Sequence, residues 1–195
     1  HTLDDCRAAL DAGFTSLMFD GSNLPLARNI EATFAATELA HAAGVSCEGE
    51  IGLVGYAGDA ASSSTDPEEA ARFATETGVD AMAISIGNIH LQQDQGQGLD
   101  VLRLRAIEAL TAVPLVIHGG SGVPTVQRAA LAATSHICKF NIGTELRMAF
   151  GAALRASVGR DPARFDRIAI LKDTEASVMA ATRAVIRGLG ASGRV

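Results

Sequence analysis

The chain has 195 residues, 48% of them hydrophobic and none of them tryptophan, which is enough for one substantial core and favours a helix-rich α/β protein. The formal net charge of −6, without a run of Lys or Arg, argues against nucleic acid or an anionic membrane as the partner. Three unclustered cysteines predict no disulfide framework and a cytoplasmic location.

Segments with helical hydrophobic spacing, bounded by Pro, Asp or Gly, alternate along the chain with short apolar runs. The spacing predicts helices over residues 3–12, 25–43, 67–77, 99–111, 124–133 and 145–157, and a long helical segment up to residue 189. The apolar runs predict strands over residues 14–19, 45–51, 81–86, 114–117 and 136–140. Because these strands are mostly continuous apolar runs, we expect a parallel sheet covered by helices.

The first residues and one long loop stand apart from this alternation. Thr2, with Asp5 in an acidic first turn, is placed as an N-cap, so the chain enters a helix at once without an initiator methionine. We expect the chain to begin inside a longer protein, with a processing site as the alternative. Segment 52–65 is long for a connection from strand to helix and is either a mobile lid or a disordered loop.

Polar residues fall at the same place in successive strand–helix units. Asp20, Glu50, His90, His118 and Asn141 each lie at or just after the end of a predicted strand. Each has an ordinary structural explanation: a turn former, a solvated edge carboxylate, core histidines and a helix cap. Their shared position favours function, because the carboxyl edge of the sheet carries the chemistry in (β/α)₈ barrels and in open α/β sheets alike.

The two histidines of this set predict a metal site. His90 and His118 lie about one strand–helix unit apart, which places them on neighbouring strands. Glu48 and Glu50 are two residues apart in one strand, so both carboxylates face the same side. A catalytic Zn²⁺ normally has three protein ligands, so the third is Asp20, Glu50 or a residue outside this chain.

Two glycine-containing loops that follow consecutive strands predict a phosphate site. Their residues are Gly119, Gly120 and Ser121 in the first loop, and Asn141, Ile142, Gly143 and Thr144 in the second. A phosphate site after the last two strands recurs in TIM barrels, and hydroxyls and free N–H groups at a helix N-terminus bind anions. The alternative is a pair of tight turns in which glycine serves only the backbone.

Six stretches, in this order, resemble the class II, zinc-dependent ketose-bisphosphate aldolases, the fructose- and tagatose-bisphosphate aldolase family. They are Leu3-Asp4-Asp5, Met18-Phe19-Asp20-Gly21-Ser22, Glu48-Gly49-Glu50-Ile51-Gly52, Ile86-Gly87-Asn88-Ile89-His90, Val116-Ile117-His118-Gly119-Gly120-Ser121 and Asn141-Ile142-Gly143-Thr144-Glu145. The resemblance implies a (β/α)₈ TIM barrel, of which residues 1–195 form a single partial domain with the last five strand–helix units. It implies cleavage of a ketose 1,6-bisphosphate to glycerone phosphate and glyceraldehyde 3-phosphate, with zinc polarising the ketone, and a homodimer or homotetramer.

The resemblance also implies residue roles. His90 and His118 correspond to zinc ligands, and Asp20 and Glu50 to carboxylates that hold the metal in a second, buried position. The two glycine-containing loops correspond to the site for the glycerone phosphate part, Arg194 to a contact for the other phosphate, and a monovalent cation is a further candidate cofactor.

Three departures from the family pattern matter. The Leu-Asp-His motif that supplies the remaining zinc ligand and the acid/base aspartate would fall immediately before His1, so no catalytic residue is assigned. Leu91 stands where the family often has glycine, and Asp59 is the one candidate for the acidic residue of the mobile loop. The alternatives are another metal-dependent, phosphate-binding TIM-barrel lyase and an inactive remnant that acts only in assembly.

Overall fold

The computed structural model describes residues 2–56, 63–96 and 98–193. Two candidate site residues, Asp59 and Arg194, lie outside the described residues, as does part of the expected lid. None of the described helices is long and apolar enough to cross a membrane.

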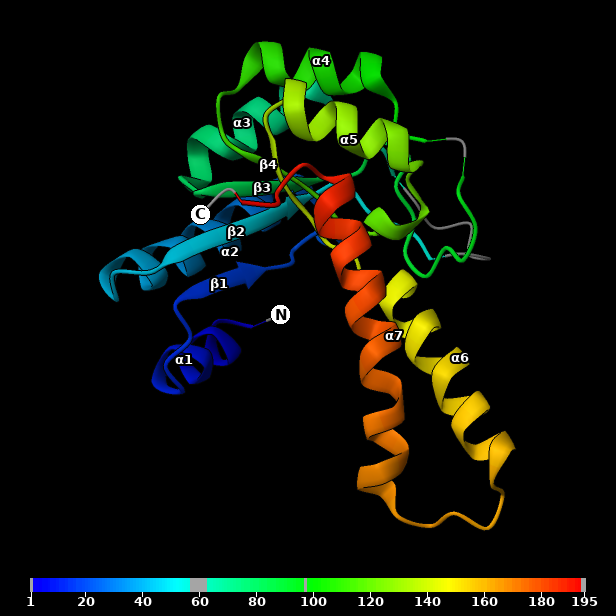
Figure 1. Ribbon diagram of the computed structural model, residues 1–195. Coiled ribbons are helices and arrows are strands. Elements are labelled where there is room, and N and C mark those ends of the chain that lie inside the picture. Colours follow the sequence, from blue (N-terminus) through cyan, green and yellow to red (C-terminus); the bar gives the residue numbers. More distant parts are fainter. Residues whose placement is uncertain (1, 57–62, 97, 194–195) are drawn as a thin grey trace.

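The sheet has five parallel strands in the order β1-β2-β3-β4-β5 (Figure 1). The strands are β1 (Ser16–Phe19), β2 (Ser46–Ile51), β3 (Ala81–Ile84), β4 (Leu115–Ile117) and β5 (Ile137–Phe140). All five predicted strands are confirmed. Sequence order equals spatial order, whereas a doubly wound sheet reverses its order at a switch point, so this is the winding of a barrel.

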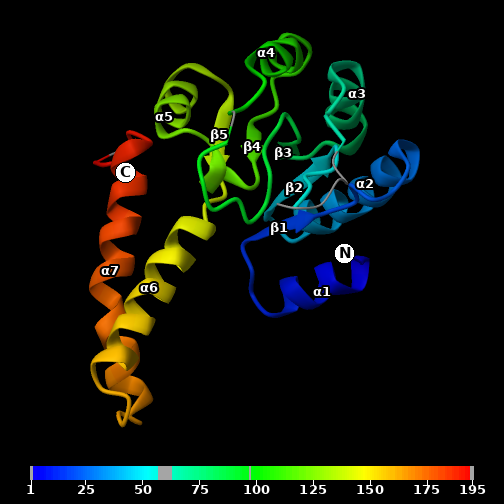
Figure 2. The same ribbon diagram turned by 90° about the vertical axis from the view of Figure 1, so that its right-hand side faces the viewer.

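The helices connect and cover these strands. They are α1 (Leu3–Asp11), α2 (Leu26–Ala42), α3 (Pro67–Thr77), α4 (Val101–Leu110), α5 (Thr125–Thr134), α6 (Thr144–Arg160) and α7 (Arg167–Gly188), with a short 3₁₀ turn at Gly120–Gly122. In Figures 1 and 2, α3, α4 and α5 lie along one side of the sheet, and α6 and α7 project away from it as a hairpin.

Local chemistry explains where helices begin and end. Thr2 and Asp5 form the expected capping box of α1. Asp66 accepts hydrogen bonds from two N–H groups in the first turn of α3, where Pro67 already fixes the backbone. That helix ends at Gly78, whose φ of 65° is left-handed.

The strands have two unlike faces. The outer face packs on the helices, with Met82, Ile84 and Ile117 fully buried around Phe73. The inner face carries the alternate residues, which include Glu48, Glu50 and His118. Because a bulge between Leu115 and Val116 shifts the register, Val116 pairs with Lys139, and this lysine also lies on the inner face.

Candidate active site

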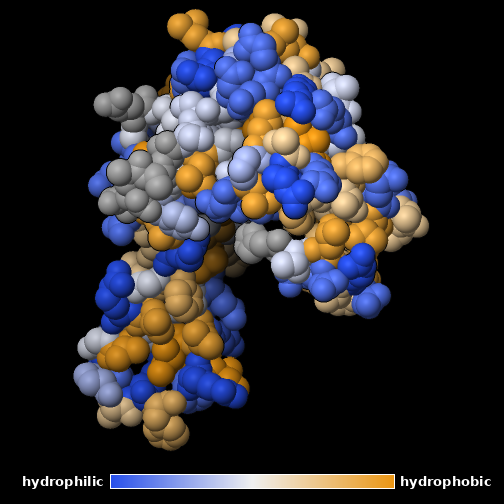
Figure 3. All heavy atoms as spheres, turned by 180° about the vertical axis from the view of Figure 1, so that it is seen from behind, coloured by the Kyte–Doolittle hydropathy of each residue, from blue (hydrophilic) through white to orange (hydrophobic). Residues whose placement is uncertain are grey.

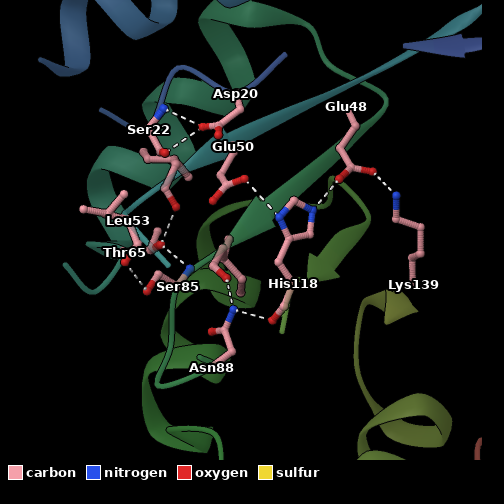
Figure 4. A network of polar contacts seen from close by, with 12 residues as sticks. Asp20, Ser22, Glu48, Glu50, Leu53, Thr65, Ser85, Asn88, His118 and Lys139 are labelled. Carbon is pink, nitrogen blue, oxygen red and sulfur yellow. Dashed lines mark hydrogen bonds and ion pairs between the residues drawn. The ribbon is translucent and has the colours of Figure 1, made fainter. Parts of the chain in front are cut away.

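The centre of the candidate site is an imidazole held between two carboxylates on the inner face of the sheet (Figure 4). His118 Nε2 lies 3.0 Å from Glu48 Oε1, and His118 Nδ1 lies 3.0 Å from Glu50 Oε2. All three residues are buried, and Glu48 also contacts Lys139, whose Nζ is 2.5 Å from Oε2. The expected placement of both carboxylates on one side of β2 therefore produces a charged chain across three strands.

The charges of this chain depend on one another. Burial alone lowers the pKa of His118, but the hydrogen bonds with Glu48 and Glu50 outweigh burial and raise that pKa to about 9. Burial likewise raises the pKa of Glu48, but hydrogen bonds from His118 and Lys139 leave it below its ordinary value. The two carboxylates therefore favour the protonated form of the His118 ring, in which each ring N–H can donate to one of them.

Asn88 fixes the backbone around His118. Its side-chain amide donates to the carbonyl of His118 at 2.9 Å, and its side-chain oxygen accepts the N–H of Ile86 at 2.8 Å. Asn88 is 3% exposed, so these bonds tie the end of β3 to the end of β4 in a buried setting. In the sequence, Asn88 stands out only as a member of the Ile86-Gly87-Asn88-Ile89-His90 stretch.

A second histidine lies beside this centre. The ring centroids of His90 and His118 are 6.1 Å apart, and the His90 ring is 5.0 Å from that of Tyr56. Burial and the charge of His118 lower the pKa of His90, so it is the neutral imidazole of the two. A cavity of about 460 Å³ is lined by both histidines together with Asp20 and Glu50.

Further hydrogen bonds hold Asp20 in the cavity wall and the segment that follows β2. Asp20 Oδ1 accepts hydrogen bonds from the N–H and the hydroxyl of Ser22. The ends of the expected lid are anchored by Thr65, which donates to the carbonyl of Ile51 at 2.7 Å and accepts the N–H of Ser85 at 2.8 Å (Figure 4). Residues 57–62 of that segment lie outside the described residues.

The two predicted phosphate loops meet in an adjoining cavity of about 630 Å³. We call residues 119–121 and 141–144 the anion cradle. Gly119, Ser121 and residues 141–144 line the cavity, whereas Gly120 does not. The N–H of Gly120 donates to the carbonyl of Asn141 at 3.0 Å and so joins the two loops. His90 and Tyr56 line both cavities, so the anion cradle and the histidine cavity are neighbours.

The N-terminus of α6 points into the anion cradle. Gly143 has no side chain to cap the helix, and Ser121 replaces it: its hydroxyl oxygen accepts the N–H groups of Thr144 and Glu145 at 3.1 and 3.3 Å. Ser121 also lines the cavity itself. The positive end of the helix dipole, together with Arg147 in the lining of the same cavity, makes this end of α6 suited to an anion.

Two cationic residues of the site, Lys139 and Arg147, were not predicted from the sequence. Lys139 lies in β5, a strand of four residues, which is too short for its hydrophobic pattern to show which face of the sheet the lysine is on. Arg147 lines the cavity of the anion cradle from the first turn of α6. Side chains on a helix lean toward its N-terminus. The position of Arg147, three residues after Thr144, could therefore have predicted a cation next to the anion cradle.

The donor atoms at the histidine cavity suit Zn²⁺, which binds imidazole nitrogen and carboxylate oxygen. Glu48 holds one nitrogen of His118, as carboxylates often do for metal-bound histidines, and the other nitrogen faces the cavity side with Glu50. Within residues 2–56, 63–96 and 98–193, however, no three His, Cys, Asp or Glu side chains are grouped as metal ligands. The predicted set of Asp20, Glu50, His90 and His118 shares one cavity, in which Glu50 contacts the ring of His118.

Comparison with known proteins gives a consistent result. A family model described as fructose-bisphosphate aldolase class-II matches residues 1–194. Fructose-bisphosphate aldolase from Geobacillus stearothermophilus is 36% identical, over 99% of this chain and 68% of that protein. The 6-phospho-5-dehydro-2-deoxy-D-gluconate aldolase of Shouchella clausii is 37% identical, over 99% of this chain and 67% of that protein. The crystal structure of the YdjI aldolase from Escherichia coli K12 superposes with a TM-score of 0.79 at 28% identity, covering all of this chain and 67% of that one.

Proposed function

Because this chain belongs to the class II fructose-bisphosphate aldolase family, we propose that the protein is a zinc-dependent enzyme that cleaves a ketose 1,6-bisphosphate. The substrate is fructose or tagatose bisphosphate, and the products are glycerone phosphate and glyceraldehyde 3-phosphate. Residues 1–195 contribute a single partial barrel domain, and the protein works as a homodimer or homotetramer.

The observation that carries this proposal is the shared wall between two cavities. The anion cradle ends at a helix N-terminus, and the histidine cavity next to it is lined by two imidazoles and two carboxylates. A phosphate bound in the anion cradle places the adjoining carbon atoms of the same molecule beside His90. Anchoring by phosphate and reaction a few atoms away is what cleavage of a sugar phosphate requires.

The residues of the histidine cavity have distinct tasks in this proposal. His90 and His118 would hold the zinc ion, with Asp20 and Glu50 available for a second position. Bound zinc would supply Lewis-acid polarisation of the substrate carbonyl. Glu48 orients the His118 ring, and Lys139 compensates the charge of Glu48.

Arg147 and the anion cradle determine which charge the substrate must carry on this side. The cavity of the cradle has a helix N-terminus and a guanidinium among its lining residues, so the substrate must be anionic on this side. The second candidate substrate is 6-phospho-5-dehydro-2-deoxy-D-gluconate, because a relative of comparable identity is named for its cleavage.

A substrate panel tests this proposal. The full-length protein, loaded with zinc, is assayed with fructose 1,6-bisphosphate, tagatose 1,6-bisphosphate and 6-phospho-5-dehydro-2-deoxy-D-gluconate, and the products are identified. We expect one of the two bisphosphates to have the highest kcat/KM. If only 6-phospho-5-dehydro-2-deoxy-D-gluconate is cleaved, the protein is the aldolase of that compound and not of a ketose bisphosphate. If none of the three is cleaved, the alternative of an inactive remnant is supported.

A further inference from the structure

Arg128 is a buried arginine for which the reaction described above has no use. It lies in α5 with 4% of its surface exposed. Its Nη1 is 2.5 Å from Glu145 Oε1 and its Nη2 is 3.4 Å from Glu145 Oε2, so the guanidinium contacts both carboxylate oxygens. Nη1 also donates to the carbonyl of Gly120 at 3.2 Å. A planar guanidinium can make such a set of bonds at once.

The two partners of Arg128 lie at different halves of the anion cradle, one within the first half and one directly after the second. Gly120 lies in the loop after β4, and Glu145 directly follows Thr144 in the first turn of α6. The halves are also joined by the N–H of Gly120, which donates to Asn141, and by the hydroxyl of Ser121. Arg128 is the charged link among these contacts, and it does not line the cavity itself.

We propose that Arg128 is a positioning residue that holds the two halves of the anion cradle at a fixed separation and thereby sets the affinity for phosphate. The proposal rests on the proposed function in treating the cradle as the phosphate site. Without the guanidinium, the carbonyl of Gly120 and the carboxylate of Glu145 lose a shared donor. The N-terminus of α6 is then held to the loop after β4 only by the neutral hydrogen bonds of Gly120 and Ser121, so the residues that line the cradle keep a less fixed spacing.

The chain offers a control that makes the same kinds of bonds at a more exposed arginine. Arg105 also joins a carboxylate to a backbone carbonyl: its Nη1 lies 2.6 Å from Glu108 Oε2 and 3.1 Å from the carbonyl oxygen of Thr134. These contacts join α4 to the last residue of α5, and none of the three residues lines the cavity of the anion cradle. Arg105→Met therefore removes the same kinds of bonds without touching the cradle.

The experiment compares Arg128→Met, Arg128→Lys and Arg105→Met in the full-length protein. Inorganic phosphate binding is measured by calorimetry, and KM and kcat are measured with the preferred substrate. For Arg128→Met we expect the phosphate Kd and KM to rise about tenfold or more with kcat within about threefold, because bonds to a charged group are lost. Arg128→Lys should recover part of this loss, and Arg105→Met should leave all three constants within about twofold.

Equal effects of Arg128→Met and Arg105→Met, or a fall in kcat with unchanged KM and phosphate Kd, would overturn the proposal. If Arg128→Met does not fold, Arg128→Lys and Glu145→Gln provide the same comparison, because each keeps a polar group in the buried site. The phosphate measurement does not depend on turnover. Phosphate binding that depends on Arg128 in a protein that cleaves no member of the substrate panel would refute the proposed function alone.

Discussion

His118 organises the candidate site because both of its ring nitrogens contact carboxylates from one strand. Glu48 and Glu50 lie on the same side of β2 and bracket the ring, while Asn88 fixes its backbone. The raised pKa of His118 shows how strongly the two carboxylates stabilise a positive charge at this point. A divalent cation next to the ring would replace the proton as the partner of Glu50.

Gly119 gives a prediction at the scale of one residue. Its φ is 64°, and a Cβ at this position would lie 2.4 Å from the carbonyl oxygen of Ile89. Gly78 has nearly the same φ, 65°, with no atom within 4 Å of such a Cβ. We expect Gly78→Ala to lower the free energy of unfolding by about 1 kcal/mol, from backbone conformation alone. Gly119→Ala should cost about 3 kcal/mol, because overpacking adds to that term.

Denaturant unfolding of the full-length protein measures both variants, with KM as a second readout for Gly119→Ala. Equal losses for the two variants would mean that the backbone of residues 89–90 yields to a methyl group, and that the wall between the cavities is not rigid.

Individual site residues were predictable to different degrees. The end of an apolar run marks the carboxyl end of a strand, so His90, His118, Asp20 and Glu50 could be placed at one edge from the sequence. The partners of these residues could not. The contact of Glu48 with Lys139 joins positions 91 residues apart, and the lysine faces inward because of a bulge that no local pattern announces.

Among the elements, the α6–α7 hairpin differs most from the rest. Only Ser157 is buried in α6 and only Thr174 in α7, both of them polar. Apolar side chains lie between hydrophilic ones on the face of the hairpin seen in Figure 3. The exposed apolar residues of the hairpin include Phe165, Ile168, Leu171 and Met179. The hairpin is therefore joined by polar contacts more than by a core, and the clearest of these converge on Asp173.

Asp173 links the two helices of the hairpin. Its Oδ2 accepts hydrogen bonds from Ser157 at 2.8 Å, Arg160 at 2.8 Å and Arg164 at 2.7 Å. The Ser157 hydroxyl and the Arg164 guanidinium lower the pKa of Asp173 below its ordinary value of 3.8. A carboxylate with a depressed pKa in the folded state contributes stability above its unfolded pKa, and that stability is lost as the pH falls through the folded value.

We therefore expect Asp173→Asn to lower the Tm at pH 7 and to lose this difference from the wild type as the pH falls below about 3.8. The control is Glu175→Gln, an exposed position of the same helix, which should shift the Tm by no more than about 1 °C at pH 7. Thermal unfolding across this pH range gives the answer. A difference that persists unchanged at low pH would show that the amide itself, rather than the lost charge, destabilises the hairpin.

The bounds of this hairpin were only partly predictable. Apolar spacing predicted one helix over 145–157 and a further segment up to 189, but α6 continues to Arg160 and α7 begins at Arg167. The reason is that few apolar residues of the hairpin are buried, so their spacing carries little information about packing. Capping by Asp166, which accepts the N–H of Ile168, marks the true start of α7.

For the whole molecule, the order of the strands identifies the sheet as part of a barrel. Five parallel strands in sequence order match five units of an eight-stranded barrel, and the aldolase relatives are covered to about two thirds of their length. The alternation of elements predicted the parallel sheet, and the family resemblance predicted the barrel. The convergence of two loops on one anion cradle needed the fold, because residues 119 and 144 meet only when β4 and β5 are neighbours.

The most direct test of the account is the metal dependence of cleavage by the full-length protein. Cleavage of the preferred ketose bisphosphate is measured in the purified protein, after treatment with a chelator and after return of Zn²⁺, with the zinc content determined at each stage. The account predicts that activity falls with the zinc content and returns with it. Cleavage that continues unchanged in protein freed of zinc would contradict it.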